Sequence, residues 1–388
     1  MQRTYEEINE KIRNGDAVIM TAEEVIDLVD SQGLEGATKE VDVVTTGTFG
    51  AMCSSGAFLN FGHSEPPIRM QKVWLNDVPA YTGIAAVDAY IGATEVEDDD
   101  DYTYGGAHVI EDLIAGKGVH LKARSHGTDC YPRKEIDTWV SLKTMNEAFL
   151  FNPRNAYQNY GVAVNSSSQT LLTYMGKLLA NYRNATYSTS GQLSPLLNDP
   201  ELRTIGIGTR IFLGGGEGYV AWQGTQFNTT RELRNGVPIG GARTLSVIGD
   251  MRGMSTEYVR ALNMHGYGIS LAVGIGVPIP ILDENVMRAV AVRDEDIYAP
   301  VFDYSIQSRN RKALKQVSYA ELRSGTIDLF GKKIRTSSLS SYYKARMVAN
   351  ELKRWMQEGE FLLTEPSARL PATGTVKSLD INTREEVE

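Results

Sequence analysis

The distribution of glycine is the sequence feature that most constrains how this chain can fold. The chain of 388 residues contains 37 glycines, and many of them stand in clusters such as 214–218. Glycine adopts backbone conformations that other residues avoid and lets two backbone segments approach closely, so the clusters indicate many tight turns. Runs rich in β-branched residues lie between the clusters, at 41–46, 204–213 and 269–281. We therefore expect an α/β (mixed) fold, a Gly-rich mixed sheet with flanking helices.

Polar residues at helix starts and glycines at helix ends predict where those helices lie. Thr4 and Thr21 each stand three residues before a glutamate, which is the capping-box spacing, and predict short helices over 5–14 and 22–31. These two form a small N-terminal helical portion. Apolar spacing, a serine cap or a glycine stop predicts the remaining helices, at 107–115, 166–181, 255–266 and 341–358.

The domain organisation follows from the lack of repeats and linkers. Neither divides the chain before residue 371, so we expect a single domain over 1–371. From 372 to 388 the sequence is polar and without pattern, which predicts a polar C-terminal tail.

Charge and cysteine content narrow the function classes. The formal net charge of −9 argues against nucleic acid or an anionic membrane as the main partner. Two cysteines do not make a disulfide framework, which indicates a reducing compartment. The N-terminus lacks an apolar signal region, and no stretch of about eighteen apolar residues predicts a membrane span. We therefore expect a cytoplasmic protein.

Sites for metals, clusters and nucleotides find little support. The five histidines show no paired spacing, CxxC is absent, and the acidic run 95–101 lacks EF-hand spacing. The cluster 214–218 lacks the Lys-Ser/Thr of a phosphate loop, and a strand follows it where a dinucleotide fold needs a helix. A hairpin turn or a close approach to substrate fits it better. We expect no bound metal and no bound cofactor.

The two cysteines then become the candidate reactive groups. Cys130 lies in the segment 122–134 among the cations Lys122, Arg124, His126, Arg133 and Lys134. Nearby cations favour a thiolate, and Gly127 and Pro132 favour a shaped loop. Cys53 follows a predicted strand among glycines and serines. The residues alone leave three interpretations open: an attacking and a resolving thiol, two inert thiols, or a redox-sensing pair.

Several long motifs resemble the homocysteine biosynthesis (HcyBio) family. The resemblance covers residues 5–371 and is carried by the segments 106–116, 127–134, 152–160, 187–199, 206–216, 274–282 and 359–366. It implies L-aspartate semialdehyde sulfurtransferase activity, in which sulfur is added to the aldehyde carbon and reduction gives L-homocysteine. The family's two cysteines fall on Cys53 and Cys130. The match of 127–134 makes Cys130 the implied persulfide carrier and Cys53 its assistant.

The resemblance also implies a partner protein that donates electrons. Many relatives continue into CBS domains or a ferredoxin module, and the sequence 1–388 contains no CBS or ferredoxin module. The implied electron source is an external ferredoxin-type donor, a separate ferredoxin-domain partner protein. Homo-oligomer formation is left open.

These expectations combine into a mechanistic hypothesis. Cys130 takes sulfur from sulfide or a sulfur-donor protein, the aldehyde condenses with it, and Cys53 or an external reductant releases the product. Direct exchange between the cysteines requires Cα atoms within roughly 7 Å. The candidates to bind the substrate carboxylate or amino group, or to act as acid–base, are Arg133, Arg154, Arg210, Asp129, Asp199 and His126.

Two rival functions are weighed against this hypothesis. The first is a thiol-based redox sensor or scaffold without turnover, which the two cysteines alone do not exclude. The second is a nicotinamide oxidoreductase, which the missing dinucleotide fingerprint disfavours.

Overall fold

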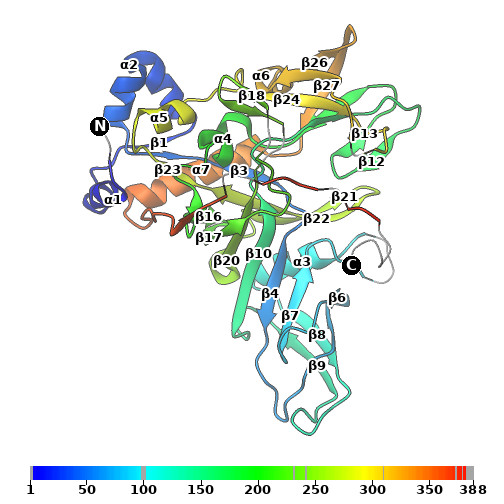
Figure 1. The fold of residues 1–388 in the computed structure, drawn as a ribbon. Helices are drawn as coiled ribbons and strands as arrows, with labels where there is room; N and C mark the ends of the chain where they lie inside the picture. The colour runs from blue at the N-terminus through cyan, green and yellow to red at the C-terminus, as the bar shows by residue number, and fades with distance from the viewer. Residues whose placement is uncertain are drawn as a thin grey trace.

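The computed structural model describes residues 3–97, 102–229, 232–240, 243–308, 310–371, 374–377 and 379–381. The fold is mixed α/β, as the sequence predicts. Figure 1 shows an elongated molecule in which a long central sheet joins an upper part, containing both N-terminal helices, to a lower arm.

The central sheet is antiparallel throughout its described pairs. Its neighbouring strands are, in order, β21 (Val259–Met264), β22 (Gly268–Gly276), β16 (Arg210–Leu213), β17 (Gly216–Gln223), β20 (Leu245–Asp250), β10 (Glu147–Asn155), β4 (Gly56–Asn60) and β7 (Asp88–Gly92), and β3 (Thr48–Ala51) also pairs with β22. Gly214 and Gly215, at φ 63° and 99°, form the two-residue turn between β16 and β17. The glycine cluster 214–218 is therefore a hairpin turn, as expected.

The upper part holds a mixed six-stranded sheet and a small three-stranded sheet. The first orders β25 (Lys315–Ser318), β24 (Tyr298–Asp303), β11 (Val162–Val164), β14 (Asn184–Tyr187), β27 (Lys332–Ser338) and β26 (Thr326–Leu329). The second orders β1 (Ile19–Thr21), β2 (Val43–Thr45) and β23 (Pro278–Pro280). The helices of this part are α1 (Tyr5–Asn14), α2 (Glu24–Glu40), α4 (Pro195–Asn198), α5 (Glu284–Val290), α6 (Tyr319–Arg323) and α7 (Tyr342–Gln357).

Helix α7 connects the upper part to the central sheet. Ser341 caps it by accepting a hydrogen bond from the Lys344 backbone, and its buried face includes Ala345 and Val348. The contact is close: a Cβ atom on Gly47 would lie 2.1 Å from the carbonyl oxygen of Ala345. Glycine at position 47 is what allows the helix to approach the start of β3.

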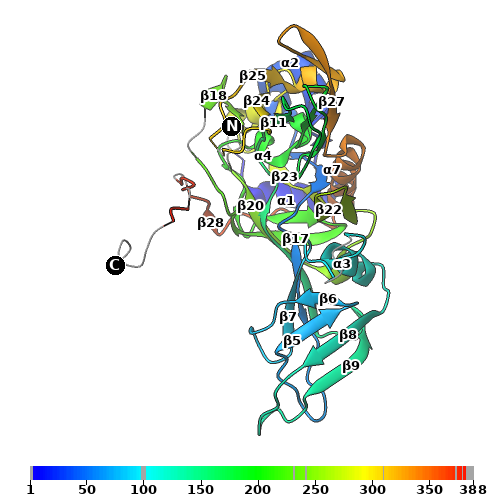
Figure 2. The same ribbon diagram turned by 90° about the vertical axis from the view of Figure 1, so that its right-hand side faces the viewer.

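The lower arm is a four-stranded antiparallel sheet that extends away from the body (Figure 2). Its order is β6 (Val78–Ala80), β5 (Lys72–Leu75), β8 (Val119–Arg124) and β9 (Glu135–Val140), and helix α3 (Gly106–Ile114) precedes β8. Leu59 of β4, Leu121 of β8 and Ile275 of β22 belong to one buried apolar cluster. The inner face of the arm therefore shares a core with the central sheet.

The predicted helices at 5–14, 107–115 and 341–358 are confirmed as α1, α3 and α7. Helix α2 continues past residue 31 to Glu40, with Gly33 at φ 74° interrupting its helical geometry.

Two predicted helices are wrong. Residues 166–181 contain the hairpin of β12 (Leu171–Thr173) and β13 (Gly176–Leu178), because Gly176 turns the chain at φ 81°. Residues 255–266 form one turn at Ser255 and then strand β21, whose full-length pairing with β22 overrides the local helix signal.

The last described strand lies just before the predicted tail at 372–388: β28 (Ala368–Arg369) pairs with β15 (Gly206–Ile207). A separate two-stranded sheet is formed by β18 (Glu232–Arg234) and β19 (Val237–Ile239). Of the predicted tail, residues 372–373, 378 and 382–388 lie outside the described residues. The single domain over 1–371 stays a prediction. Within the described ranges, every helix is too short or too polar to cross a membrane.

Candidate functional site

A cavity of about 700 Å³ lies where β3, β4 and β22 meet the β12–β13 hairpin and the segment that follows β10. The side chains that give it chemical character are one thiol, one guanidinium and several phenols. The lining residues are Ala51, Met52, Cys53, Ser54, Thr94, Val96, Tyr102, Arg154, Tyr157, Tyr160, Tyr174, Met175, Ser188, Tyr267, Gly268, Ile269 and Leu339. Its volume falls in the usual range for small-molecule sites.

Cys53 is half-buried in this cavity, in the turn between β3 and β4. The buried side chain of Asn152 fixes the turn: its Oδ1 accepts a hydrogen bond from the Ser54 hydroxyl at 2.9 Å, and its Nδ2 donates to the Ser55 hydroxyl at 2.8 Å. The Ser270 hydroxyl donates to Cys53 Sγ at 3.4 Å. The strand that carries Ser270 therefore places a hydrogen-bond donor on the sulfur.

Arg154 places a positive charge in the same cavity. Its Nε donates to the Thr225 hydroxyl at 3.0 Å, and its charge acts on the side chain of Tyr157, which lines the same cavity. Burial raises the pKa of the Tyr157 hydroxyl, against the opposing effect of Arg154. Tyr157 is therefore a neutral hydrogen-bond donor at neutral pH.

Two of the other phenols, Tyr160 and Tyr174, belong to a hydroxyl chain that reaches Tyr304, which is outside the described lining. Tyr160 donates to Tyr174 at 3.4 Å, and the Tyr174 and Tyr304 hydroxyls are 3.0 Å apart. Burial raises the pKa of Tyr160 and of Tyr267, and proximity to Cys53 adds to the second. These groups too are protonated at neutral pH.

The chemistry of the cavity is limited by its side chains. Among the described residues, its lining contains no His, Asp, Glu or Lys. Across the same part of the chain, no group of three or more His, Cys, Asp or Glu side chains is placed to hold a metal ion. The arrangement suits a sulfur nucleophile, an anionic substrate group held by Arg154, and proton transfer by phenols.

Cys130 lies elsewhere, exposed on the loop between β8 and β9 at the far end of the arm. Thr128 and Tyr131 exchange backbone hydrogen bonds of 2.9 and 3.1 Å, which puts Asp129 and Cys130 at the centre of a tight turn. Gly127 has φ 79°, so the predicted loop is confirmed. Cys130 and the exposed Asp129 are not among the described residues that line the cavity.

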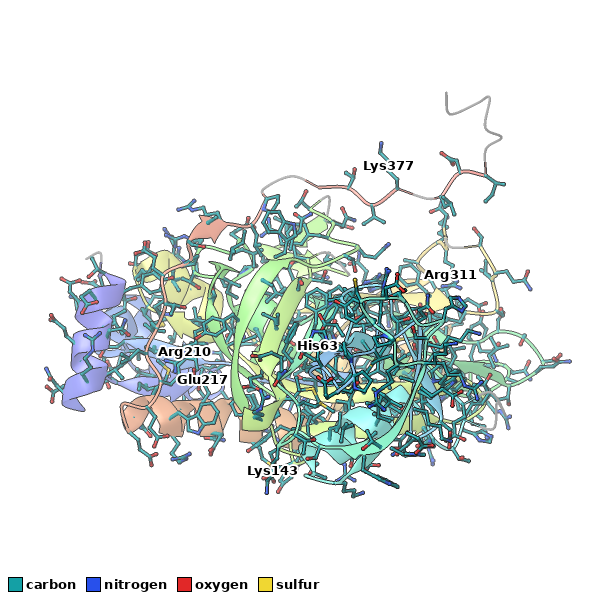
Figure 3. The ribbon with its side chains drawn as sticks, turned by 90° about the horizontal axis from the view of Figure 1, so that it is seen from below. His63, Lys143, Arg210, Glu217, Arg311 and Lys377 are labelled. Atoms are coloured by element: carbon teal, nitrogen blue, oxygen red, sulfur yellow. The ribbon has the colours of Figure 1, made fainter. Side chains whose placement is uncertain are left out.

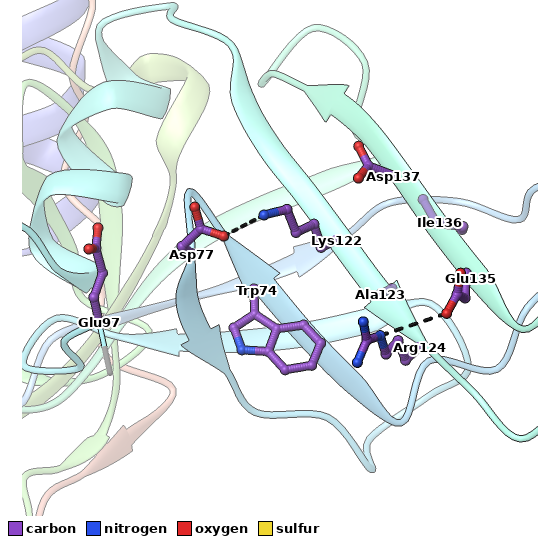
Figure 4. Close-up of a pocket in the computed structure, with 9 residues that line it drawn as sticks. All are labelled: Trp74, Asp77, Glu97, Lys122, Ala123, Arg124, Glu135, Ile136 and Asp137. Carbon is purple, nitrogen blue, oxygen red and sulfur yellow. Dashed lines mark hydrogen bonds and ion pairs between the residues drawn. The ribbon is translucent and has the colours of Figure 1, made fainter. Parts of the chain in front are cut away.

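Three of the cations near Cys130 in sequence hold the arm together. Lys122 donates to Asp77 at 2.6 Å and Arg124 pairs with Glu135 at 3.8 Å, and all four residues line one pocket of the arm (Figure 4). Arg133 donates to the carbonyl oxygens of Glu65 and Pro66 at 2.6 and 2.9 Å and so ties the loop to the β4–β5 connection.

The structure does not bring the two cysteines together. Cys53 lies just before the start of β4, and His63 lies just after its end. The ring of His63 stacks on the ring of Tyr131, the residue after Cys130, with 6.0 Å between the ring centroids. Pairing with the β7 segment runs from Ser55 to Phe61. At about 3.3 Å per residue the two ends of this stretch are roughly 20 Å apart. The expected contact between the two cysteines is therefore wrong for a single chain.

The remaining predicted site residues have structural partners. Arg210 on β16 donates from Nε to Glu217 at 3.0 Å and lies 4.4 Å over the Phe361 ring; Figure 3 shows Arg210 beside Glu217. Asp199 is buried and accepts hydrogen bonds from Thr204 at 2.8 Å. Of the predicted residues, the structure brings only Cys53 and Arg154 into the described lining of the cavity.

Sequence reasoning missed the phenols. Tyr157 and Tyr160 stand in the motif 152–160, beside Arg154, and this proximity could have suggested them. Tyr174 lies in the wrongly predicted helix 166–181, and Tyr267 just after the wrongly predicted helix 255–266. No local signal marked these two.

Comparison with known proteins agrees with this geometry. The family described as "Homocysteine biosynthesis enzyme, sulfur-incorporation" (HcyBio) matches residues 17–363. A Methanosarcina acetivorans protein named L-aspartate semialdehyde sulfurtransferase is 53% identical over 379 residues, which is 98% of this chain and 74% of that protein. A Methanocaldococcus jannaschii protein of the same name is 52% identical, over 94% of this chain and 72% of its own length. No solved structure matches. The chain belongs to the HcyBio family of homocysteine biosynthesis enzymes.

Proposed function

We propose that this chain is an L-aspartate semialdehyde sulfurtransferase that forms the carbon–sulfur bond of L-homocysteine. Two close relatives carry that name. The observation that carries the proposal is the presence of Cys53 and Arg154 in one cavity of substrate size. A thiol supplies the sulfur chemistry, and a guanidinium binds the carboxylate that every amino-acid substrate has.

The overall reaction needs electrons from outside. An aldehyde and hydrogen sulfide give a thiol and water only with two added electrons and two protons. If the sulfur arrives as the sulfane sulfur of a persulfide, four electrons and four protons are needed. We assign this supply to a ferredoxin-type donor protein, since the described part of the chain offers no cluster ligands.

The structure leads us to exchange the roles that the sequence suggests for the two cysteines. Cys53 carries the sulfur that attacks the aldehyde, because it shares a cavity with Arg154 and accepts a hydrogen bond from Ser270. Cys130 is exposed at the end of the arm, where a sulfur or electron donor protein can reach it. We expect the enzyme in the cytoplasm, where reducing conditions preserve both thiols.

Two alanine variants test these roles. The assay supplies aspartate semialdehyde, sulfide and a small-molecule reductant, and measures homocysteine. Cys53→Ala is expected to abolish the product and Cys130→Ala to retain it, because no partner protein has to reach the arm. In a separate sample without reductant, treated with polysulfide as a sulfane-sulfur donor, mass spectrometry should locate one added sulfur on Cys53, with the shortened polysulfide as the leaving group. If only Cys130→Ala abolishes the product, the carrier is Cys130, as predicted from the sequence.

The same assay separates the rival function. A thiol-based redox sensor or scaffold makes no homocysteine with any reductant. Product formation by the unmodified chain, lost in Cys53→Ala, excludes that alternative.

A further inference from the structure

The proposed reaction needs a proton donor in the cavity. When sulfur attacks the aldehyde carbon, the carbonyl electron pair moves onto oxygen, and a nearby acid must neutralise the developing charge. The described lining contains no His, Asp, Glu or Lys. An arginine does not give up its proton in proteins. Among the described lining residues, the phenols are the groups suited to donate this proton.

Tyr157 is set apart from the other phenols by its contacts. Tyr160 and Tyr174 donate or accept within the hydroxyl chain that includes Tyr304. Tyr157 instead lines the cavity with Cys53 and Arg154; burial raises its pKa, and the charge of Arg154 opposes that shift. Tyr267 is also near Cys53, but burial and the charges of Cys53 and Tyr174 all raise its pKa and so oppose release of its proton. Tyr157 thus shares the cavity with Cys53, the proposed sulfur carrier, and with Arg154, the proposed partner of the substrate carboxylate.

The backbone around Tyr157 is fixed by buried amide side chains. Ala156 adopts φ 48°, a left-handed conformation held by a hydrogen bond from its N–H to Asn155 Oδ1 at 2.7 Å. Gln158 donates to the carbonyl oxygen of Leu196 at 2.9 Å, and Asn159 to that of Tyr298 at 2.9 Å. Strained backbone that its surroundings hold in place is a feature of functional sites.

We infer that Tyr157 is the general acid of the reaction and donates its hydroxyl proton to the aldehyde oxygen as sulfur on Cys53 adds to the carbonyl carbon. The inference rests on the proposed function. In this step the carbon–sulfur bond forms, the carbonyl π bond breaks, and the proton leaves the Tyr157 oxygen for the substrate oxygen. No electron is gained or lost. The Arg154 guanidinium stabilises the phenolate that remains, which regains its proton from water.

Tyr157→Phe tests the inference, because it removes the hydroxyl and keeps the ring. With polysulfide as the sulfane-sulfur donor, the variant is expected to form the Cys53 persulfide as the unmodified chain does. After aspartate semialdehyde and a reductant are added, it is expected to lose about 100-fold or more in the rate of homocysteine formation. Tyr304→Phe is the matched control: it removes one hydroxyl of the same tyrosine cluster from a residue outside the described lining. Activity of Tyr157→Phe close to that of Tyr304→Phe would overturn the assignment.

A second measurement covers the case in which Tyr157→Phe does not fold. Replacing Tyr157 with a fluorinated tyrosine keeps the shape and makes the phenol more acidic. A proton donor works only below its own pKa, and burial places the pKa of Tyr157 above the ordinary tyrosine value. The alkaline loss of activity should therefore move to lower pH in the fluorinated protein.

The groups that face Tyr157 are Arg154, Cys53, Tyr174 and Tyr160, and the substitution leaves all four unchanged. If the alkaline loss of activity occurs at the same pH in the fluorinated and the unmodified protein, Tyr157 is not the general acid. If the unmodified chain makes no homocysteine at all, the proposed function fails instead, so the two failures are distinguishable.

Discussion

Ser270 donates a hydrogen bond from its hydroxyl to the sulfur of Cys53 at 3.4 Å. Ser270 is fully buried on β22, and Cys53 lies on the turn that follows β3, the strand paired with β22. The pairing of these two strands thus sets the contact between hydroxyl and thiol.

Ser270→Ala is expected to slow the reaction of Cys53 with an alkylating reagent at neutral pH by about fivefold, since a net hydrogen bond contributes about 1 kcal/mol. The measurement is made in a Cys130→Ala background, so that only Cys53 reacts. Removing the hydroxyl leaves the thiolate without that donor. An alkylation rate equal to that of the parent would show that the contact does not act on the sulfur.

Arg154→Gln is expected to raise KM for aspartate semialdehyde by roughly tenfold or more, because a charge-assisted hydrogen bond contributes about 1.5–3 kcal/mol. The penalty should disappear for an aldehyde that lacks the carboxylate. Arg210→Gln is the control, since Arg210 pairs with Glu217 outside the described lining. It should lower thermal stability and leave KM unchanged. Equal KM changes in both variants would contradict the role of Arg154.

Gly47→Ala is expected to destabilise the fold by about 1–3 kcal/mol, the usual range for overpacking. The new Cβ atom would lie 2.1 Å from the Ala345 carbonyl oxygen, so α7 must move away from β3. Gly92→Ala on β7 is the matched control, because its Cβ atom would have nothing within 4 Å. Urea unfolding compares the two. A similar loss in both variants would mean that the approach of α7 is not limiting.

Asp283 gives the stability an acid-sensitive component. The hydrogen bond and charge of Arg203 lower its pKa to about 2, and its side chain also caps α5 by accepting from Val286. A carboxyl with a lowered pKa stabilises the fold above its unfolded value of about 3.9, and this contribution is lost as pH falls toward 2.

Asp283→Asn should therefore remove part of the pH dependence of urea unfolding between those two values. Asp283 is half-buried but Arg203 is exposed, so solvent screening keeps the contribution of the pair at neutral pH to about 1 kcal/mol. Arg203→Gln, which removes the partner and keeps the cap, should give a similar profile. An unchanged acid limb in both variants would contradict this origin.

An element of the fold is predictable from the sequence when the residues that determine it are close together in the chain. The Ser341 cap and the apolar face of α7 are written in adjacent residues, and that helix is confirmed. Residues 255–266 carry an equally good cap at Ser255, yet the segment pairs with β22 over its whole length. A partner more distant in sequence decides that case, and no local pattern contains it.

The site shows the same division. Cys53 and Arg154 were identified from residue type and motif. Their grouping with Tyr174 and Tyr267 depends on how the β12–β13 hairpin folds over the end of β22, which sequence spacing does not encode. The cations around Cys130 are close to it in sequence, but three of them bind other groups. Lys122 and Arg124, on strand β8, bind Asp77 and Glu135, and Arg133, in the loop, binds the Glu65 carbonyl oxygen.

The length of β4 has a kinetic consequence. Because a paired strand holds the turn of Cys53 and the end of the arm apart, a sulfur atom cannot pass between the two thiols of one molecule by a simple collision. Transfer of sulfur between the two thiols therefore requires a second molecule as carrier. The rate of this transfer rises with the concentration of the carrier molecule and falls on dilution. The rate of the chemical step inside the cavity does not depend on concentration.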